Sequence, residues 1–378
     1  MHVVVVTVAH RGDDARIVHR QARALLEAGH SVVLVAPDPG PEPRRFDPVG
    51  LEREPIRRAV GRRRIHAWYE LSRLLSRVCR SADLVIFHDP ELIPLLSFRR
   101  LGGAIRVWDV HEDYRALVSD TSWIPPMLTG PVRGALGILN SIARRRCKIL
   151  IAEASYVTSF PQSVLVPNTT RVDSVFTSVT QPLRVVYVGR VSFDRGLREM
   201  IELGERLVQR GGPEVVIAGP SDDDCRAVLL DAVARGAVRW CGPIPNPQVF
   251  DVIRGSVAGL ALLHDVANYR FSNPTKVWEY WSVGVPVIGT PLPSMTKMVS
   301  EAGGGVVLTG FSGPGVVEEA ERAIDELSSR PERRDALGRS GWNLAGSTSD
   351  WARDGLDFVR ELERLASESR TSRSRIGK

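Results

Sequence analysis

Two arginines occupy one short loop that follows a strand-like run of apolar residues. Arg190 and Arg195 lie between Gly189 and Gly196, directly after the run Arg184–Val188. Arginine can hold two phosphate oxygens at once and stays charged at any working pH. A loop of this kind, which opens a βα unit, is therefore a candidate phosphate site. The alternative is a pair of solvated surface charges.

The stretch Asn273–Thr290 predicts a helix, a stop and a buried strand. Asn273 can cap the helix, and Pro274 suits its first turn, where a missing N–H costs nothing. Gly284 ends the helix, and Pro286 prevents its continuation. The helix therefore begins with free N–H groups and the positive end of its dipole.

A helix start of this kind can receive a phosphate. The candidate donors are the backbone amides of Thr275 and Lys276, and Glu279 can accept hydrogen bonds from a neighbouring sugar diol. Together these groups suit a nucleotide diphosphate. The alternative is an exposed ion pair between Lys276 and Glu279 on an ordinary surface helix.

Three histidines, His10, His88 and His111, follow other strand-like runs of the chain. These runs are His2–Val8, Asp83–Phe87 and Arg106–Val110. Parallel sheets bind ligands beyond the carboxyl ends of their strands, so the three loops are expected at one functional edge. Each histidine either takes part in chemistry or is a satisfied strand-end residue.

The loop after the first strand offers a second kind of signal. Gly12 would let a ligand approach the backbone, and Asp14 is expected to cap the following helix. Asp89, with Pro90 after it, is expected to cap another helix. The first loop lacks the spacing of a dinucleotide fingerprint, which argues against a dehydrogenase.

Composition places the chain among ordinary globular proteins. Its 378 residues exceed what one hydrophobic core usually serves, and they are 43% hydrophobic and 25% charged. The net charge of +6 suits phosphate-bearing ligands or an anionic membrane surface, but no nucleic-acid-binding signature accompanies it. The four cysteines lack metal-ligand spacing, and Asp222–Asp224 is interpreted as an acidic helix start, so no metal is assigned.

Strand-like and helical runs alternate through both halves of the chain, which predicts an α/β fold. The expected parts are a first domain at 1–172, a Ser/Thr-rich linker at 173–182, a second domain at 183–345, a helix at 346–366 and a disordered basic tail at 367–378. Within the first domain, residues 38–80 are interpreted as a solvated connection rich in Pro and Arg that leads into an apolar helix. The alternative for its basic run is contact with anionic lipid headgroups.

Three segments of the chain resemble those of bacterial family-4 glycosyltransferases. They read HRGDDARIVHRQARALLEAGHSV, HDPEL and WDVHEDY. The resemblance implies retaining enzymes with the GT-B fold, in which two Rossmann-like domains with parallel sheets face each other. It also implies that the C-terminal helix crosses back to the first domain.

The same resemblance implies roles for individual residues. His111 would lie near the reacting sugar, Arg190 and Arg195 would grip the diphosphate, Ile244 would contact the base, and Glu279 would hold the ribose. The first of two glutamates that the family usually has falls at Phe271, so recognition of the donor sugar is assigned to other candidates. These are Asn268, Tyr269 and Asn273, while His10, His88 and Glu112 are expected on the acceptor side near Gly12.

The expected function is transfer of a sugar from a nucleotide diphosphate sugar to an acceptor hydroxyl, without cofactor or metal. The acceptor would be a saccharide, a lipid-linked molecule or a small molecule, in surface polysaccharide or glycolipid assembly or else in secondary metabolism. An epimerase of the same fold and a two-lobed binding module without turnover are the rivals. A cytoplasmic location is expected, and contact with the inner face of the membrane through the segment around Arg144–Arg146 is left open.

Overall fold

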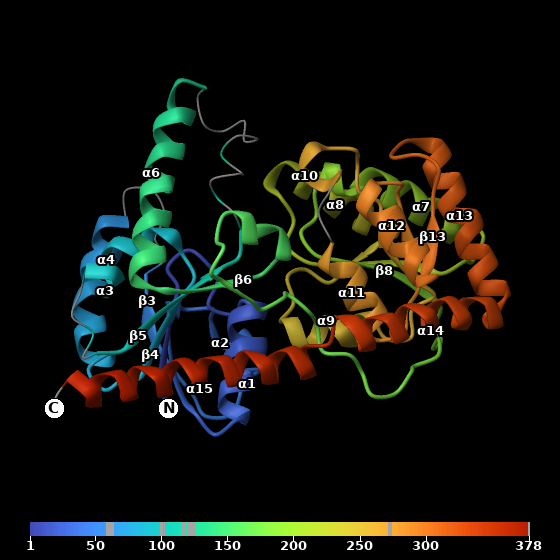
Figure 1. Cartoon of the computed structure of the whole chain (residues 1–378). Helices are drawn as coiled ribbons and strands as arrows, with labels where there is room; N and C mark the ends of the chain where they lie inside the picture. Colours follow the sequence, from blue (N-terminus) through green and yellow to red (C-terminus); the bar gives the residue numbers. More distant parts are fainter. Residues whose placement is uncertain are drawn as a thin grey trace. The chain divides into compact units, whose positions relative to one another are not determined.

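The structure is a computed structural model that describes residues 1–57, 64–98, 101, 103–112, 114, 118, 126–270 and 274–376. The chain forms two compact units. Unit 1 consists of Met1–Asn168 and Arg353–Lys378, and unit 2 consists of Thr169–Ala352. The predicted linker at 173–182 therefore belongs to unit 2. Figure 1 shows that each unit contains a sheet with helices packed around it.

Unit 1 is built on a seven-stranded parallel sheet in the order β3-β2-β1-β4-β5-β6-β7. The strands are β1 (His2–Val6), β2 (Ser31–Pro37), β3 (Leu51–Ile56), β4 (Leu84–Phe87), β5 (Ile105–Val110), β6 (Lys148–Ile151) and β7 (Val164–Leu165). The central strands are continuous apolar runs that are buried on both faces, as parallel sheets require.

β3 corrects the prediction that residues 38–80 are a solvated connection before a helix. The strand pairs with β2 at one edge of the sheet, and its side chains are only partly buried. Its sequence, LEREPI, mixes charged residues with a proline, so it lacks the apolar run of a central strand. An edge strand tolerates both features because one side of its backbone faces solvent.

The helices of unit 1 cover the two faces of this sheet (Figure 1). A π-helical segment, Ala15–Ala22, runs into α1 (Arg23–Glu27), and α2 (Pro41–Arg44), α3 (Arg64–Val78), α4 (Ile93–Phe98), α6 (Pro126–Arg146) and α15 (Trp351–Ile376) follow, with 3-10 turns at Pro90–Leu92 and Ala154–Thr158. The tail predicted to be disordered from residue 367 is helical as far as Ile376. No glycine or proline interrupts the sequence between Gly355 and Gly377, so nothing in it stops the helix earlier.

Unit 2 is built on a six-stranded parallel sheet in the order β10-β9-β8-β11-β12-β13. The strands are β8 (Arg184–Val188), β9 (Glu214–Ala218), β10 (Arg239–Trp240), β11 (Ala258–Ala261), β12 (Val287–Gly289) and β13 (Gly305–Val307). The helices are α7 (Leu197–Gln209), α8 (Asp223–Ala234), α9 (Asn246–Ile253), α10 (Ala267–Arg270), α11 (Thr275–Ser282), α12 (Pro293–Ala302), α13 (Pro314–Ser329) and α14 (Pro331–Thr348), with a 3-10 turn at Phe193–Arg195.

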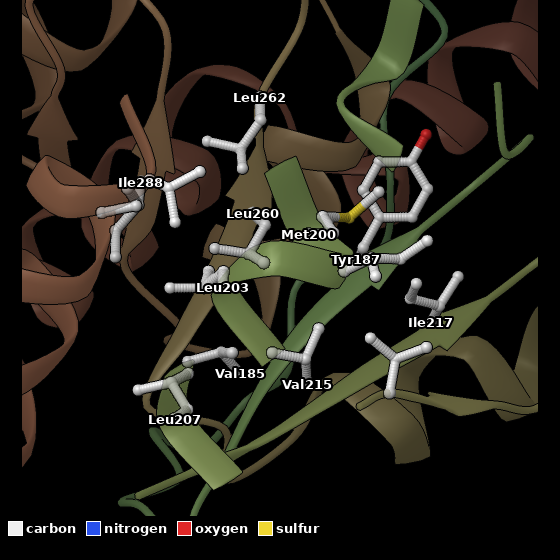
Figure 2. Close-up of a cluster of buried hydrophobic side chains, with 14 of the residues drawn as sticks. Val185, Tyr187, Met200, Leu203, Leu207, Val215, Ile217, Leu260, Leu262 and Ile288 are labelled. Atoms are coloured by element: carbon white, nitrogen blue, oxygen red, sulfur yellow. The ribbon is translucent and has the colours of Figure 1, made fainter. Parts of the chain in front are cut away.

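One core of unit 2 lies between its sheet and α7. Figure 2 shows aliphatic side chains of β8, β9 and β11 packed against Met200, Leu203 and Leu207 of α7, with the ring of Tyr187 beside Met200. This packing fixes the start of α7, and with it the loop that carries Arg190 and Arg195. In the described part of the chain, no helix has the length and apolar character needed to cross a membrane.

Candidate functional site

The three histidines of unit 1 lie together at the carboxyl edge of its sheet. Nδ1 of His88 lies 3.0 Å from Nε2 of His111. The ring centroids of His10 and His111 are 4.5 Å apart. Their loops follow β1, β4 and β5, which are neighbours in the sheet, so the strand order itself brings the histidines together.

A carboxylate that sequence analysis did not single out, Asp109 of β5, holds this histidine pair. Its Oδ2 lies 3.1 Å from Nε2 of His111 and 3.3 Å from Nδ1 of His88. Asp109 is fully buried. It stands inside a strand-like run, WDV, where an acidic residue could have been a sign of a site, because buried acids are rarely left unpaired.

Asp109 is itself anchored by the helix that follows β1. Nε of Arg16 donates to Oδ2 at 2.8 Å, Nη2 of Arg16 donates to Oδ1 at 2.7 Å, and the Gln21 amide donates to Oδ2 at 2.8 Å. Arg16 and Gln21 are five residues apart, and the π-helical winding of Ala15–Ala22 places residues at this spacing on one face. Burial opposes ionisation of Asp109, but Arg16 and the two histidines hold its pKa well below 3.8.

The charge on Asp109 selects the proton positions on the histidines. Burial lowers the pKa of His88 to about 4, so this ring is neutral at pH 7. Of the two nitrogens near Asp109, Nε2 of His111 is the closer, so it is assigned as a donor to the carboxylate. This assignment leaves Nδ1 of His111 with a lone pair that can accept a proton from a hydroxyl.

His88, Asp109 and His111 also form a group whose ligand atoms lie within 4.8 Å of one another. Two imidazoles and one carboxylate are suitable ligands for a divalent cation. The Asp109 oxygens, however, already accept bonds from Arg16 and Gln21, and the guanidinium charge would repel a cation at the same carboxylate. The residues therefore fit a hydrogen-bonded acid–base pair better than a metal centre.

The other predicted residues on this edge have structural roles. Asp14 caps the first helix, as predicted, through bonds from the amides of Arg16 and Ile17. Asp89 makes no cap bond, contrary to the prediction, and instead accepts from Thr7 Oγ1 and the Val8 amide. The Asp89 carboxylate therefore ties the loop after β1 to the loop after β4.

Gly12 and Glu112 complete the set of predicted residues in unit 1. A Cβ at Gly12 would lie 1.9 Å from the carbonyl oxygen of Pro37, so packing between two loops already requires the glycine there. Glu112 is exposed beside His111. A place for a ligand next to Gly12 is thus not needed to explain this residue, and its role in donor binding remains a prediction.

In unit 2, two basic side chains approach Gly189, the first residue after β8. A Cβ built on Gly189 would lie 3.9 Å from Nζ of Lys276 and 4.0 Å from Nη1 of Arg195. Gly189 has a φ of 116°, a conformation that side chains disfavour, and it carries no side chain to block the position between the two cations. The phosphate loop and the start of α11, predicted from separate parts of the sequence, are thus adjacent.

Lys276 is the unexpected member of this group. Its residue is 6% exposed, and its Nζ has no hydrogen-bond partner among the described residues. Nζ lies 3.8 Å from the ring centroid of Tyr187. The alternative of an exposed Lys276–Glu279 pair is therefore wrong for Lys276, while Glu279 is half-buried one turn farther along α11. Burial, together with the charge of Arg195, lowers the pKa of Lys276 well below 10.5.

The two arginines of the loop differ in their surroundings. Arg195 is partly buried, and its Nε donates to the hydroxyl of Tyr269 at 3.2 Å. The side chain of Arg190 is 64% exposed, and its Nε is paired with the carboxylate of Asp222. Asp222 precedes α8 without capping it, so its carboxylate serves the arginine rather than the helix.

The remaining donor-side predictions divide into described and undescribed residues. α11 starts at Thr275 and is preceded by Pro274 in the cap position, so the predicted cap at Asn273 is wrong. Ile244 follows β10 and packs against a buried cluster of unit 2. Asn273 and Phe271 lie outside the described residues, and the side chain of Asn268 is likewise not described.

Comparison with known families and structures adds to this geometry. Residues 15–160 match the family model described as Glycosyltransferase Family 4, and residues 197–354 match one described as Glycosyl transferase-like. None of the curated proteins compared with the chain matches it.

Solved structures match both units at low sequence identity. A sucrose-phosphate synthase from Thermosynechococcus elongatus has a TM-score of 0.67 at 12% identity, and the match covers 97% of this chain and 99% of that one. WaaG, a glycosyltransferase involved in lipopolysaccharide biosynthesis, has a TM-score of 0.63 at 14% identity, and the match covers 96% of this chain and 99% of WaaG. Anabaena HepE in complex with UDP-glucose has a TM-score of 0.63 at 11% identity, and the match covers 97% of this chain and 99% of HepE. Together with the two Rossmann-like units, these matches confirm the predicted fold: the chain belongs to the family-4-type glycosyltransferases and has the GT-B fold.

Proposed function

We propose that this glycosyltransferase moves a hexosyl group from a nucleotide diphosphate sugar to an acceptor hydroxyl with retention of anomeric configuration. The observation that carries the donor assignment is the convergence of Arg195 and Lys276 over Gly189. Two basic side chains that face the same position can both bind an anion placed there. A diphosphate at the start of α11 would supply that anion, with the amides of Thr275 and Lys276 as further donors.

The same cations explain why no metal is included in the proposal. Charge that develops on the leaving diphosphate needs a positive partner in the transition state. Arg190, Arg195 and Lys276 supply it from the protein, so we expect turnover to persist in excess EDTA. Loss of turnover in EDTA, restored by a divalent cation, would contradict this part of the proposal.

On the acceptor side, unit 1 offers His111 as the group that accepts a hydrogen bond from the reacting hydroxyl. The hydrogen bond between His111 and Asp109 supports this role, because with Nε2 of His111 donating to the carboxylate, Nδ1 of the same ring is an acceptor. We propose an acceptor of surface polysaccharide or glycolipid assembly at the cytoplasmic face of the membrane. Support comes from α6, where the exposed Ile138 lies on the same helix as the basic run Arg144–Arg146.

The decisive experiment is a panel of nucleotide-sugars, starting with UDP-glucose, in which nucleotide release is measured with and without acceptor extracts. Release that depends on acceptor, with a product of unchanged anomeric configuration by NMR, supports the proposal. Conversion of the donor without acceptor indicates an epimerase, and binding without conversion indicates a binding module. Sedimentation with anionic vesicles tests the membrane contact.

Arg195→Ala and Arg190→Ala test the donor site within this assay. Each is expected to lose about 2–4 kcal/mol of transition-state stabilisation, by analogy with removal of one donor to a developing anion. Arg235→Ala, which removes an exposed arginine from the end of α8 in the same unit, is the matched control. Turnover within a few-fold of the wild type in both site variants would contradict their role.

A further inference from the structure

Lys276 differs from the other basic residues in both type and place. Only four of the 50 basic residues of the chain are lysines, namely Lys148, Lys276, Lys297 and Lys378. Lys297, for comparison, has a side chain that is 75% exposed. Arginine keeps its proton in a protein, whereas a buried lysine can lose it. Most basic residues of this chain are arginines, which stay charged. At this site the chain instead has a lysine, whose charge can change.

The immediate neighbours of the amine supply almost nothing that would hold an ammonium ion. No described residue forms a hydrogen bond with its Nζ, and the face of the Tyr187 ring lies 3.8 Å away. A ring face attracts an ammonium, but this attraction is smaller than the cost of removing the ion from water. Arg195 approaches from the phosphate loop and repels a second positive charge.

The other charged and titratable groups around the amine are already engaged or work only partly in its favour. Glu279, on the same helix, favours the charged form but does not outweigh burial and Arg195, so the pKa of Lys276 is lowered. The hydroxyl of Tyr280 donates to the Leu260 carbonyl, and that of Tyr269 accepts from Arg195. On the far side of the loop, the carboxylate of Asp222 is paired with Arg190.

We propose that Lys276 is a proton-linked phosphate ligand, which is neutral in the free protein and takes up one proton from solvent as the diphosphate of the donor binds. This inference rests on the donor assignment proposed above. A bound diphosphate would balance the charge of Arg195 and give Nζ the acceptor that it lacks. No bond of the donor changes in this step, since a single hydrogen ion enters the protein.

The linkage predicts how affinity depends on pH. Because binding consumes a proton, the affinity for the donor should fall as pH rises, by as much as tenfold per pH unit. This fall is confined to the range between the pKa of Lys276 in the free protein and its higher value in the complex. A UDP-sugar has no phosphate that titrates near neutral pH, so the proton counted belongs to the protein.

The first test follows the four lysines by NMR in protein labelled with 13C-lysine. Lys276→Met identifies the signal of Lys276, and the pH titration is run on the free protein and on the protein saturated with UDP-glucose. The midpoint of this signal is expected to lie below the pH of the binding assay in the free protein and above that pH in the complex. A free-protein midpoint above the pH of the assay would overturn the inference whether or not the donor binds.

The second test counts protons by calorimetry of UDP-glucose binding in buffers of different ionisation enthalpy at one pH. The wild type and the control Lys297→Met are expected to take up close to one proton, and Lys276→Arg, which is always charged, close to none. Equal uptake by Lys276→Arg and the wild type would overturn the inference. Failure of every nucleotide-sugar of the panel to bind would contradict the donor assignment instead, while the titration of the free protein still decides the state of the amine.

Discussion

At the scale of single residues, Asp109 determines how the histidines of unit 1 can act. Asp109→Asn would replace an acceptor by an amide that can donate to Nε2 of His111, which favours the other tautomer of the ring. We expect turnover to fall about 100-fold, the lower range for loss of a positioned acid–base group, with little change in the KM for the donor. Steady-state kinetics give the first result, and 15N NMR of the imidazoles reports the tautomer.

A purely structural effect of this substitution must be separated from its effect on chemistry. Removal of the carboxylate leaves Arg16 as a buried charge without its partner, which costs about 3–5 kcal/mol of stability. Circular dichroism and a urea titration establish that the variant is folded under assay conditions. Asp231→Asn, an exposed aspartate of α8, is the control. A folded Asp109→Asn protein with unchanged tautomer and turnover would refute the role of Asp109.

Lys276 allows a prediction about stability that needs no substrate. Its pKa is lower in the folded protein than in the unfolded chain, so below pH 10.5 the unfolded chain binds a proton that the folded protein does not. Stability is therefore lost as pH falls below 10.5. Lys276→Met should raise the free energy of unfolding at pH 7 by about 1–3 kcal/mol, the typical cost of an unpaired buried polar group.

Urea unfolding at pH 7 and at pH 10 measures the difference in free energy of unfolding between Lys276→Met and the wild type, and how this difference changes with pH. The advantage of Lys276→Met over the wild type should shrink at the higher pH, because the amine is then closer to neutral in both states. An equal difference at the two pH values would show that packing, rather than charge, determines the effect.

These two residues also show where sequence reasoning ends. Arg190 and Arg195 could be found because they stand in a loop after a strand-like run. The sequence suggested a backbone amide or an exposed ion pair with Glu279 for Lys276, although Lys276 shares a helix face with Tyr280, four residues on, which is fully buried. Asp109 was missed because its partners, Arg16 and Gln21, are far away in sequence and are aligned only by a π-helical turn that periodicity does not reveal.

At the scale of elements, one hydroxyl of α11 bonds to two strands of its sheet, β8 and β11. Tyr280 donates to the Leu260 carbonyl at 2.9 Å and accepts from the Val188 amide at 3.2 Å. Tyr280→Phe would leave both backbone groups without this partner, at a cost of about 1–3 kcal/mol. Because α11 carries Lys276 and Glu279, we also expect a higher KM for the donor.

Denaturant unfolding and donor kinetics measure the two effects, with Tyr69→Phe on the exposed face of α3 as the control. A variant with wild-type stability and KM would show that the aliphatic contacts of α11 suffice to place it. Gly259 supports a role for Tyr280 in placing α11, because the backbone packs so closely against the tyrosine ring that a Cβ at Gly259 would lie 2.3 Å from it.

Elements were predictable where their own sequence decides them. The central strands are apolar runs, and the ends of α11 are set by Pro274 and Gly284. The predicted boundaries of these elements therefore lie close to the observed ones. β3 was missed because charged residues and Pro55 are allowed only by its place at the edge of the sheet. The helical end of α15 could not be predicted from composition, because its polar residues favour disorder, although none of them breaks a helix.

At the scale of the whole molecule, the donor should act on one unit only. All groups assigned to the diphosphate, base and ribose belong to Thr169–Ala352, apart from Gly12, whose presence packing already explains. Hydrogen exchange in saturating UDP-glucose is therefore expected to slow in the peptides around Gly189 and Lys276, with little change around His111. Protection confined to unit 1 would reverse the assignment of the two units.

The order of elements made the whole fold predictable, because two series of strands and helices each end in loops with ligand-binding residue types. The limits of the units were less predictable. The change from one unit to the other lies at Asn168, inside a segment whose composition alone suggested that the first domain continues to residue 172. Contacts between distant segments determine such a boundary, and composition does not record them.

The pairing of Arg190 with Asp222 has a consequence for selectivity. An anion that binds through Nε of this arginine competes with a carboxylate that is already in contact with it. Inorganic phosphate would replace the contact with Asp222 by a single new contact. A larger ligand, such as a nucleotide diphosphate sugar, would make further contacts elsewhere in the site. We therefore expect common small anions to compete only weakly for this arginine, and molecules that fit the entire site to be preferred.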